Sequence, residues 1–284
     1  MSWSPYPPLA VASRDFLLAR AARQEDPLQS LELIHFHLIM AFAYTAQFKL
    51  YEACAGKVVS GPFAGMRFPR PPECSSIQEL MPVAGGGFNI AGLLLGQYEC
   101  ELHAPIERLL TERTYDLLID VGCSTGYYAV GMARRMPEMR VEARDTNPAM
   151  HDYVRQLASL NGVADRVGVG GEWSPKDFAV ARDVRTLVFC DIEGAEVQLL
   201  DPSVAPELRT CDIIVEMHDV FDPGISAMLR SRFQDTHAIE VYANYSVRPA
   251  VPAEISVLSR HERSALFSDL RLGPTPWAVM RARS

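Results

Sequence analysis

The sequence predicts an α/β fold with a doubly wound, mostly parallel seven-stranded sheet and an N-terminal helical cap. Three observations predict it. From residue 115 onward, segments of strand character alternate with segments of helix character, as in sheets built from β-α units. Three of the strand segments, LLIDV, TLVFCD and DIIVEM, are continuous apolar runs, which is typical of parallel strands covered on both faces. Before residue 112, apolar residues instead recur three or four positions apart, which indicates helices.

The cap is predicted to occupy residues 1–112 and to contact a substrate or a second copy of the chain. Its expected elements are a long helix, a hairpin closed by prolines and a second helix broken around Pro105, over residues 13–53, 56–72 and 96–113 respectively. His35 and His37 lie on the apolar long helix, so we expect them in the core or in a homodimer contact through the N-terminal helices.

The sheet domain is predicted to occupy residues 113–284. Strands are expected over residues 117–121, 140–144, 166–170, 186–191, 212–217, 238–243 and 277–281. Helices are expected between them over residues 127–136, 148–161, 175–181, 195–200, 225–234 and 253–270. Only a sheet edge remains for the strand after the last long helix, so we expect the final strand pair to be antiparallel.

Composition excludes several classes of function. The chain has 284 residues, is 48% hydrophobic and carries a formal charge of −8 without any basic run, so nucleic acid is not an expected partner. The six cysteines show no metal-binding spacing, which favours reduced thiols and a cytoplasmic protein. The first residues lack the pattern of a signal peptide, and the most apolar stretch, residues 31–46, is too short and too polar to span a membrane.

One segment, LLIDVGCSTGYYAVGMA, predicts a strand, a glycine-bearing turn and a helix over residues 117–133. Gly122 and Gly126 let the backbone turn sharply and approach a ligand closely, and the N-terminus of the following helix favours an anion or a polar group at the same place. Asp120, at the end of the strand, is placed to accept a hydrogen bond from an ammonium group. The segment therefore predicts a ligand site at this end of the sheet.

The next two strand ends predict what that ligand is. Asp145 follows the second strand, 25 residues after Asp120 (145 − 120), where an acid binds both ribose hydroxyls of a nucleoside. Glu172 and Trp173 follow the third strand, where the edge and the face of an adenine would lie. Together these residues predict an adenosine site at the carboxyl ends of a parallel sheet.

The sequence of the turn also indicates which of two adenosine-containing cofactors, a dinucleotide such as NAD or S-adenosylmethionine, would bind. It lacks the G-x-G-x-x-G pattern that seats the pyrophosphate of a dinucleotide. The D-x-G-x-x-x-G pattern instead resembles motif I of class I methyltransferases dependent on S-adenosylmethionine (SAM), usually written [DE]-x-G-x-G-x-G, with Ser124 in place of the middle glycine. The resemblance implies a Rossmann-like fold with SAM bound at Ser124 and the glycines, Asp120 near its methionine moiety and Asp145 on its ribose.

A second resemblance narrows the function. The segment LVFCDIEGAEVQLL is similar to the D-[IV]-E-G-x-E stretch of FkbM-type methyltransferases, and the likeness extends roughly over residues 115–219. The resemblance implies a fold and SAM as cofactor but not a substrate. We expect methyl transfer to a small-molecule acceptor, at a hydroxyl oxygen, in specialised or glycan-related biosynthesis. Two alternatives remain open: carbon or nitrogen methylation, with Glu172 or Glu193 taking the proton, and a non-catalytic regulator that binds SAM.

Catalytic candidates follow the fourth and fifth strands, whose tips open onto the same crevice. His218 is the expected general base, because its unperturbed pKa lies near 6.5. Asp191 is expected to orient His218 or to contact the amine of the cofactor, and Glu193 is a third catalytic candidate. The acids that follow the fourth strand, Glu193 and Glu196, could equally cap the next helix.

A divalent metal is the alternative to His218 as the means of weakening the acceptor's proton. Asp191, Glu216 and Asp219 would supply the oxygen ligands that Mg²⁺ prefers. We expect metal-free transfer, because the DIEGAE stretch has no Asp-Asn pair of the kind that metal-dependent relatives carry.

The acceptor is expected to meet residues from both domains. Tyr98 and Glu99 belong to the predicted helix that leads into the first strand, while His218 and Asp219 follow the fifth strand. Asn244 lies in the loop after the sixth strand and completes the predicted substrate-binding set.

Overall fold

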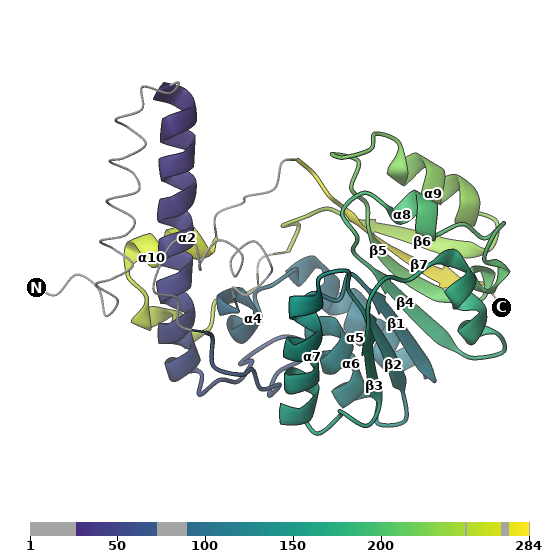
Figure 1. The fold of residues 1–284 in the computed structure, drawn as a ribbon, viewed down its shortest axis with the longest axis horizontal. Helices are drawn as coiled ribbons and strands as arrows, with labels where there is room; N and C mark the ends of the chain where they lie inside the picture. Colours follow the sequence, from purple (N-terminus) through teal and green to yellow (C-terminus); the bar gives the residue numbers. More distant parts are fainter. Residues whose placement is uncertain (1–26, 73–89, 248, 268–272, 284) are drawn as a thin grey trace, which may run out of the picture. The chain divides into compact units, whose positions relative to one another are not determined.

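The structure is a computed structural model that describes residues 27–72, 90–247, 249–267 and 273–283 (Figure 1). These residues form two compact units, which are described separately. Of the described residues, 27–60, 68–72, 90–98 and 251–267 form the helical unit, and 61–67, 99–247, 249–250 and 273–283 form the sheet unit. Within the described part of the chain, no helix is both long enough and apolar enough to cross a membrane.

The sheet unit contains a seven-stranded sheet in the order β3-β2-β1-β4-β5-β7-β6. Its strands are β1 (Leu117–Val121), β2 (Arg140–Arg144), β3 (Val167–Gly170), β4 (Thr186–Cys190), β5 (Asp212–Glu216), β6 (His237–Tyr242) and β7 (Trp277–Ala282). The first five strands are parallel, and β7 runs antiparallel to both β5 and β6. The predicted α/β fold, its mostly parallel sheet and its antiparallel final pair are therefore confirmed.

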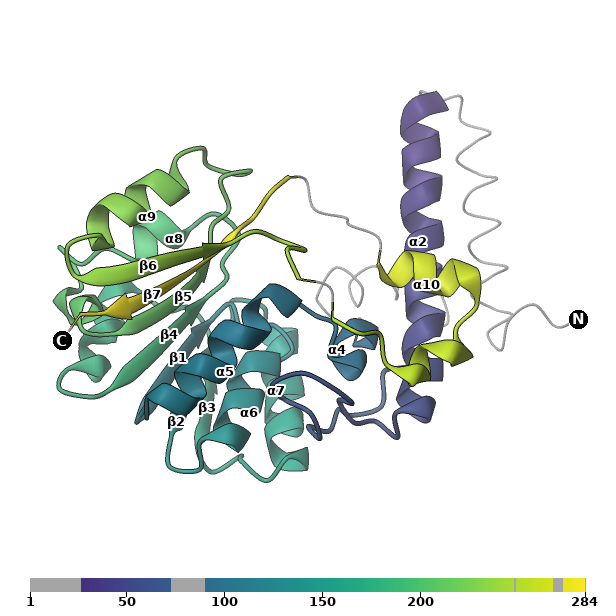
Figure 2. The same cartoon turned by 180° about the vertical axis from the view of Figure 1, so that it is seen from behind.

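Helices cover both faces of this sheet, so the predicted double winding is also confirmed (Figures 1 and 2). One face carries α5 (His103–Glu112), α6 (Tyr127–Arg135) and α7 (Pro148–Leu160), and the other carries η2 (Pro175–Ala181), α8 (Glu196–Leu199), η3 (Pro206–Arg209) and α9 (Ile225–Phe233). On the second face, β-strand residues such as Ile119, Val188 and Ile213 pack against Phe178 and Phe233. Because β1, β4 and β5 are buried along their whole length, the apolar runs of the sequence mark them well.

The helical unit contains α2 (Pro27–Ala53), α4 (Ala91–Leu95), η4 (Ala253–Val257) and α10 (Arg260–Leu266). Lys49 of α2 forms a 2.8 Å ion pair with Glu262 of α10, and Phe42 stacks on His261 with ring centroids 5.5 Å apart. The side chains of His35 and His37 lie outside the described residues, as does the predicted start of the long helix at residue 13.

Three predicted elements of the cap take a different form. No break occurs at Pro105, which lies in the first turn of α5, where the backbone N–H that proline lacks would have no helical partner. The helix predicted over residues 96–113 begins later, because Gly96 ends α4 in the left-handed conformation and a short 3₁₀ turn, η1 (Cys100–Leu102), precedes α5. The predicted hairpin over residues 56–72 contains turns and single bridge residues instead of strands.

The C-terminal segment also departs from its prediction. The helix expected over residues 253–270 is divided into η4 and α10, because Ser259 caps α10: its side chain accepts from the Glu262 N–H, and Glu262 accepts from the Ser259 N–H. The two units do not follow the predicted domain boundary at residue 112. Residues 99–112 belong to the sheet unit and residues 251–269 to the helical unit.

Candidate active site

The carboxyl ends of β1, β2, β4 and β5 bring the predicted site residues of the sheet unit to one edge of the sheet. The first of these tips is the glycine turn after β1. Gly122 and Gly126 both adopt the left-handed conformation, with φ of +82° and +80°, and α6 starts at Tyr127. A Cβ atom at residue 122 would lie 1.6 Å from the carbonyl oxygen of Asp191, so only glycine fits there. The turn is therefore packed, backbone against backbone, on the tip of β4.

Asp120 is buried in β1, beneath this turn. Burial raises the pKa of its carboxyl to about 7, although a hydrogen bond from the Ala129 amide opposes the shift. Its Oδ2 atom is buried and has no hydrogen-bond partner among the described residues. An unsatisfied buried oxygen is costly, so this atom suits a donor group of a ligand, and its contact with a cofactor stays a prediction.

Asp145 follows β2 and closes the turn from the other side. Its carboxylate accepts the Ser124 N–H at 2.9 Å and the Asn147 N–H at 2.8 Å. Ser124 has a φ of +44°, so the hydrogen bond to Asp145 holds a left-handed residue in place. Each carboxylate oxygen keeps acceptor capacity for a further donor such as a ribose hydroxyl.

Glu172 and Trp173 follow β3. The Glu172 side chain is exposed, whereas Trp173 is buried against Phe178, with ring centroids 6.0 Å apart. The guanidinium of Arg144 lies 5.0 Å from the centre of the Trp173 ring. Trp173 thus forms part of the core beside the site, and its contact with an adenine stays a prediction.

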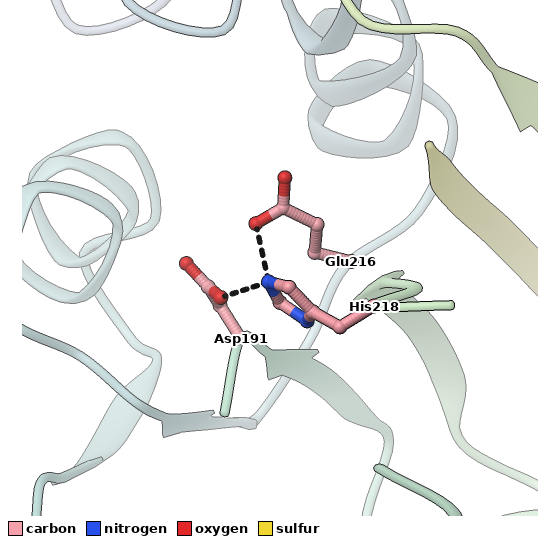
Figure 3. Close-up of side chains that lie close together, drawn as sticks. All are labelled: Asp191, Glu216 and His218. Atoms are coloured by element: carbon pink, nitrogen blue, oxygen red, sulfur yellow. Dashed lines mark ion pairs between the residues drawn. The ribbon is translucent and has the colours of Figure 1, made fainter. Parts of the chain in front are cut away.

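His218 is the centre of a buried cluster at the tips of β4 and β5 (Figure 3). Its Nδ1–H donates to Glu196 Oε1 at 2.6 Å. Its Nε2 atom faces three further carboxylates: it lies 3.3 Å from Glu216 Oε2, 3.4 Å from Glu193 Oε2 and 3.6 Å from Asp191 Oδ1. The sequence placed all of these residues at the tips of the two strands, and the structure gathers the four carboxylates around one imidazole. Their catalytic roles stay predictions.

The carboxylates change the charge of His218. Burial lowers the pKa of its imidazole, but the hydrogen bonds to Glu196 and Glu216 and the charge of Asp191 outweigh burial and raise the pKa to about 10. The ring is consequently an imidazolium at neutral pH. The expectation of an ordinary pKa near 6.5 is wrong for this surrounding.

Asp191 is partly exposed to solvent, although one of its carboxylate oxygens is buried. Its side chain is 25% exposed, and its Oδ1 atom has no hydrogen-bond partner among the described residues. Burial and the nearby charges of Glu216 and Glu99 raise the pKa of its carboxyl well above the usual range. Glu193 is far more open: its side chain is 71% exposed, and it lies in the tight turn of the DIEGAE segment with φ of +54°.

Asp219 serves the loop before α9 instead of the cluster. Its carboxylate accepts the N–H groups of Gly224 and Ser226, both at 3.1 Å, and the Ser226 hydroxyl. These hydrogen bonds lower the pKa of Asp219 despite its partial burial. The loop therefore uses the oxygens that the sequence assigned to a substrate or a metal.

The remaining predicted substrate residues lie in different units. Glu99, in the sheet unit, accepts the Tyr128 hydroxyl at 2.5 Å and raises the pKa of Asp191. Asn244 accepts the Thr275 N–H at 2.8 Å, which fixes the segment before β7. Tyr98 belongs to the helical unit, with its side chain 38% exposed.

A divalent metal fits a donor set that differs from the predicted one. Asp191, Glu216 and His218 offer ligand atoms that all lie within 4.8 Å of one another, and the buried, unpartnered Oδ1 of Asp191 is among the atoms that converge there. His218 thus takes the place that the sequence gave to Asp219. Two further residues contact the cluster without any signal in the sequence: Thr275, whose hydroxyl donates to Glu216 Oε1 at 2.7 Å, and Phe221, whose ring stacks on His218 with centroids 5.8 Å apart.

Comparisons with known proteins give one similar curated protein. No protein-family model matches the chain. The release factor glutamine methyltransferase of Chlorobaculum tepidum is 27% identical over 128 residues, which cover 44% of this chain and 40% of that relative. The match therefore spans less than half of the relative's length.

Solved structures of methyltransferases are similar to parts of the chain. The O-methyltransferase TomG of Streptomyces achromogenes, in complex with SAM, is 14% identical with a TM-score of 0.41, over 64% of this chain and 81% of that one. A Bacillus cereus O-methyltransferase with SAH is 13% identical with a TM-score of 0.40, over 62% and 77%. Precorrin-6y C5,15-methyltransferase of Geobacter metallireducens is 13% identical with a TM-score of 0.43, over 66% and 89%.

Proposed function

We propose that the protein is a class I SAM-dependent methyltransferase that acts on a hydroxyl of a small molecule. The observation that carries the proposal is the junction of two tips: the motif I turn after β1 packs its backbone on Asp191, and Asp191 in turn faces His218. A predicted adenosine site and a buried proton-handling cluster therefore share one edge of the sheet. The match to the release factor glutamine methyltransferase of Chlorobaculum tepidum supports methyl transfer as the reaction, whereas the hydroxyl acceptor rests on the sequence and the cluster.

The residues around the turn suit SAM. Asp145 would accept the ribose hydroxyls, and the unsatisfied oxygen of Asp120 would face the methionine end. Ser124 and the glycines would line the cofactor, with Glu172 and Trp173 at the adenine. When bound, SAM supplies a methyl group on a sulfonium, which reacts by in-line displacement, so the chain has mainly to position the acceptor and exclude water.

The cluster at the tips of β4 and β5 contains groups that could accept the proton of the acceptor hydroxyl. A carboxyl whose pKa is raised is a stronger base, and Asp191 combines that shift with partial exposure. His218, charged at neutral pH, would direct an Nε2–H toward the oxygen and stabilise the negative charge that develops there. With Asp191 ionised, the acceptor hydroxyl would pass its proton to this carboxylate as its oxygen takes the methyl group, and S-adenosylhomocysteine would be the leaving group. Glu193 lies at the exposed side of the cluster.

The finer assignment depends on the sequence. The DIEGAE segment, which forms the tip of β4 and the turn into α8, supports an FkbM-type enzyme. This resemblance does not fix the acceptor, for which we propose a molecule from specialised or glycan-related biosynthesis. From the sequence we further propose a cytoplasmic protein that pairs through its N-terminal helices.

Two measurements test the proposed function. Calorimetric titration with S-adenosylhomocysteine (SAH) should show binding, whereas NAD should show none, because the turn lacks a pyrophosphate seat. Incubation with SAM and a panel of hydroxylated small molecules should yield a product heavier by one methyl group. Tight NAD binding without SAH binding would overturn the assignment.

A metal would be held by Asp191, Glu216 and His218, and it would supply a Lewis acid that lowers the pKa of an acceptor hydroxyl. We expect transfer without it, because the imidazolium of His218 already places a positive charge among these carboxylates. Exhaustive EDTA treatment should leave activity unchanged, and added Mg²⁺ or Mn²⁺ should not increase it. Loss of activity that only the ion restores would assign the three residues as ligands.

A further inference from the structure

We propose that Glu196 and Thr275 are positioning residues, which fix His218 and Glu216 so that Nε2 and Oε2 both face Asp191. The inference rests on the proposed function for its effect on turnover, but the geometry that carries it is independent of any ligand. Glu196 hydrogen-bonds to His218, and Thr275 hydrogen-bonds to Glu216, so each residue would act through the side chain that it holds.

Glu196 holds the far edge of the His218 ring. Its side chain is fully buried, and Oε1 accepts both the Nδ1–H of His218 at 2.6 Å and the backbone N–H of Gly194 at 3.1 Å. The second hydrogen bond anchors the carboxylate to the DIEGAE turn itself. Because a carboxylate accepts, Nδ1 carries a proton and Nε2 is the nitrogen left for the cluster.

The turn before α8 explains how Glu196 reaches this position. Gly194 has a φ of +107°, and a Cβ atom there would lie 3.1 Å from Cβ of Phe221. Phe221 stacks on the face of the His218 ring, and its N–H donates to the His218 carbonyl at 2.9 Å. The ring is thus held along one edge by Glu196 and across one face by Phe221, which leaves it little freedom to rotate.

Thr275 does for Glu216 what Glu196 does for His218. Its hydroxyl donates to Glu216 Oε1 at 2.7 Å, in a buried hydrogen bond between the segment before β7 and the end of β5. The Thr275 N–H is in turn fixed by Asn244 at 2.8 Å. With Oε1 occupied, Oε2 is the oxygen that points at His218 Nε2, 3.3 Å away.

The common pattern is that His218 and Glu216 each have one atom held by an outer partner, Glu196 or Thr275, while His218 Nε2 and Glu216 Oε2 face each other beside Asp191. Such outer partners set the orientation of the side chains that do chemistry, and their loss typically costs about 10–100-fold in activity. This pattern assigns a function to the second glutamate of DIEGAE, which otherwise resembles a simple helix-terminal acid.

Steady-state kinetics of three variants test the proposal. Thr275→Val keeps the shape and removes only the hydroxyl, Glu196→Gln keeps an acceptor for Nδ1–H, and Glu196→Ala removes it. We expect kcat to fall about 10–100-fold in Thr275→Val and Glu196→Ala and less in Glu196→Gln, with SAH affinity and the KM for SAM unchanged. Asp212→Asn is the matched control, because Asp212 is also a buried, hydrogen-bonded acid but lies at the opposite end of β5.

A second readout needs no activity. In ¹⁵N-histidine-labelled protein, the Nδ1–H of His218 should exchange slowly with solvent, and this signal should survive in Glu196→Gln and Asp212→Asn but vanish in Glu196→Ala. A signal that persists in Glu196→Ala, or a kcat that falls no further than in Asp212→Asn, overturns the proposal. Failure of the wild type to bind SAH would reject the proposed function alone, since the exchange experiment would still decide the positioning.

Discussion

At position 122, backbone conformation and close packing act together. Replacement by alanine would place a Cβ atom 1.6 Å from the Asp191 carbonyl oxygen on a backbone with φ of +82°. Gly162 has a similar φ, +69°, but nothing lies within 4 Å of its Cβ position. Gly162→Ala should therefore cost only the left-handed backbone, about 1–2 kcal/mol, whereas Gly122→Ala should cost about 1–3 kcal/mol more. Urea unfolding measures both; equal losses would contradict the packing of the turn on β4.

Asp145 is expected to contribute to cofactor affinity. Asp145→Ala should weaken SAH binding by about 1–3 kcal/mol, because it removes a charged acceptor for the ribose and also frees the Ser124 N–H of the turn. Asp152→Ala, which changes an exposed acid of α7, should leave affinity unchanged. Calorimetric titration compares them, and an unaltered affinity in Asp145→Ala would move the nucleoside site elsewhere.

His218 is expected to contribute to turnover and not to cofactor affinity. His218→Ala should lower kcat by about 10²–10³-fold, because a donor aimed at the developing oxyanion is lost. SAH titration of the same variant should give the wild-type affinity. A fall in SAH affinity with little change in kcat would make His218 a cofactor contact instead.

At the scale of elements, two strands place histidines in opposite surroundings. His218 follows the carboxyl end of β5, among carboxylates that raise its pKa to about 10. His237 opens β6, where burial lowers the pKa of its ring although Nε2 contacts the Cys211 carbonyl at 2.8 Å. One ring therefore favours the proton in the folded state, and the other disfavours it.

The two histidines should give the free energy of unfolding opposite pH dependences. His218 binds its proton more tightly when folded, so its contribution is complete below pH 6.5 and is lost as pH rises toward about 10. His237 binds its proton less tightly when folded, so it destabilises the fold as pH falls below 6.5. Urea unfolding across this range should show that His218→Gln removes the alkaline decline and His237→Gln the acidic one. An alkaline decline that persists in His218→Gln would contradict the raised pKa.

The strands could be predicted from the sequence because burial on both faces leaves a continuous apolar signal. The tips of β1, β2, β4 and β5 could be predicted as one site for a general reason, since parallel strands end at one edge. The sequence could not predict which carboxylate oxygen of the cluster faces which imidazole nitrogen of His218. The Glu196–His218 and Glu216–Thr275 hydrogen bonds join residues 22 and 59 positions apart, and neither separation has a pattern of its own. Asp219 illustrates the same limit, because only the fold reveals that its carboxylate closes the loop before α9.

At the scale of the whole chain, each unit is built from three separate segments of the sequence. A single domain boundary cannot describe such an arrangement. The sheet unit needs Phe63 and Glu99: the Phe63 ring centroid lies 6.0 Å from that of Tyr128, and the Tyr128 hydroxyl donates to Glu99. The helical unit needs residues 251–269, because Lys49 of α2 pairs with Glu262 of α10. The hydrophobic pattern of the sequence changes near residue 112, but tertiary contacts decide to which unit a segment belongs.

A truncated chain tests this division. Residues 113–284 alone lack Phe63, Glu99 and the α2 partner of α10, so we expect a lower unfolding midpoint than for residues 61–284, which restore the first two contacts. Thermal unfolding by circular dichroism, with SAH titration of both chains, makes the comparison. Equal midpoints would support a boundary at residue 112.

The contact between the β1 turn and the β4 tip has a mechanical consequence. The Asp191 N–H donates to the Val121 carbonyl at 2.9 Å, and the Asp191 carbonyl fills the space beside Gly122, so the two tips are joined without a hinge. A displacement of the turn would therefore require Asp191 to move as well, or these two contacts to break. A shift of the turn on exchange of SAM for its demethylated product would therefore reach, as a rigid movement, the carboxylate that faces the acceptor, and the acceptor side would sense which form of the cofactor is bound.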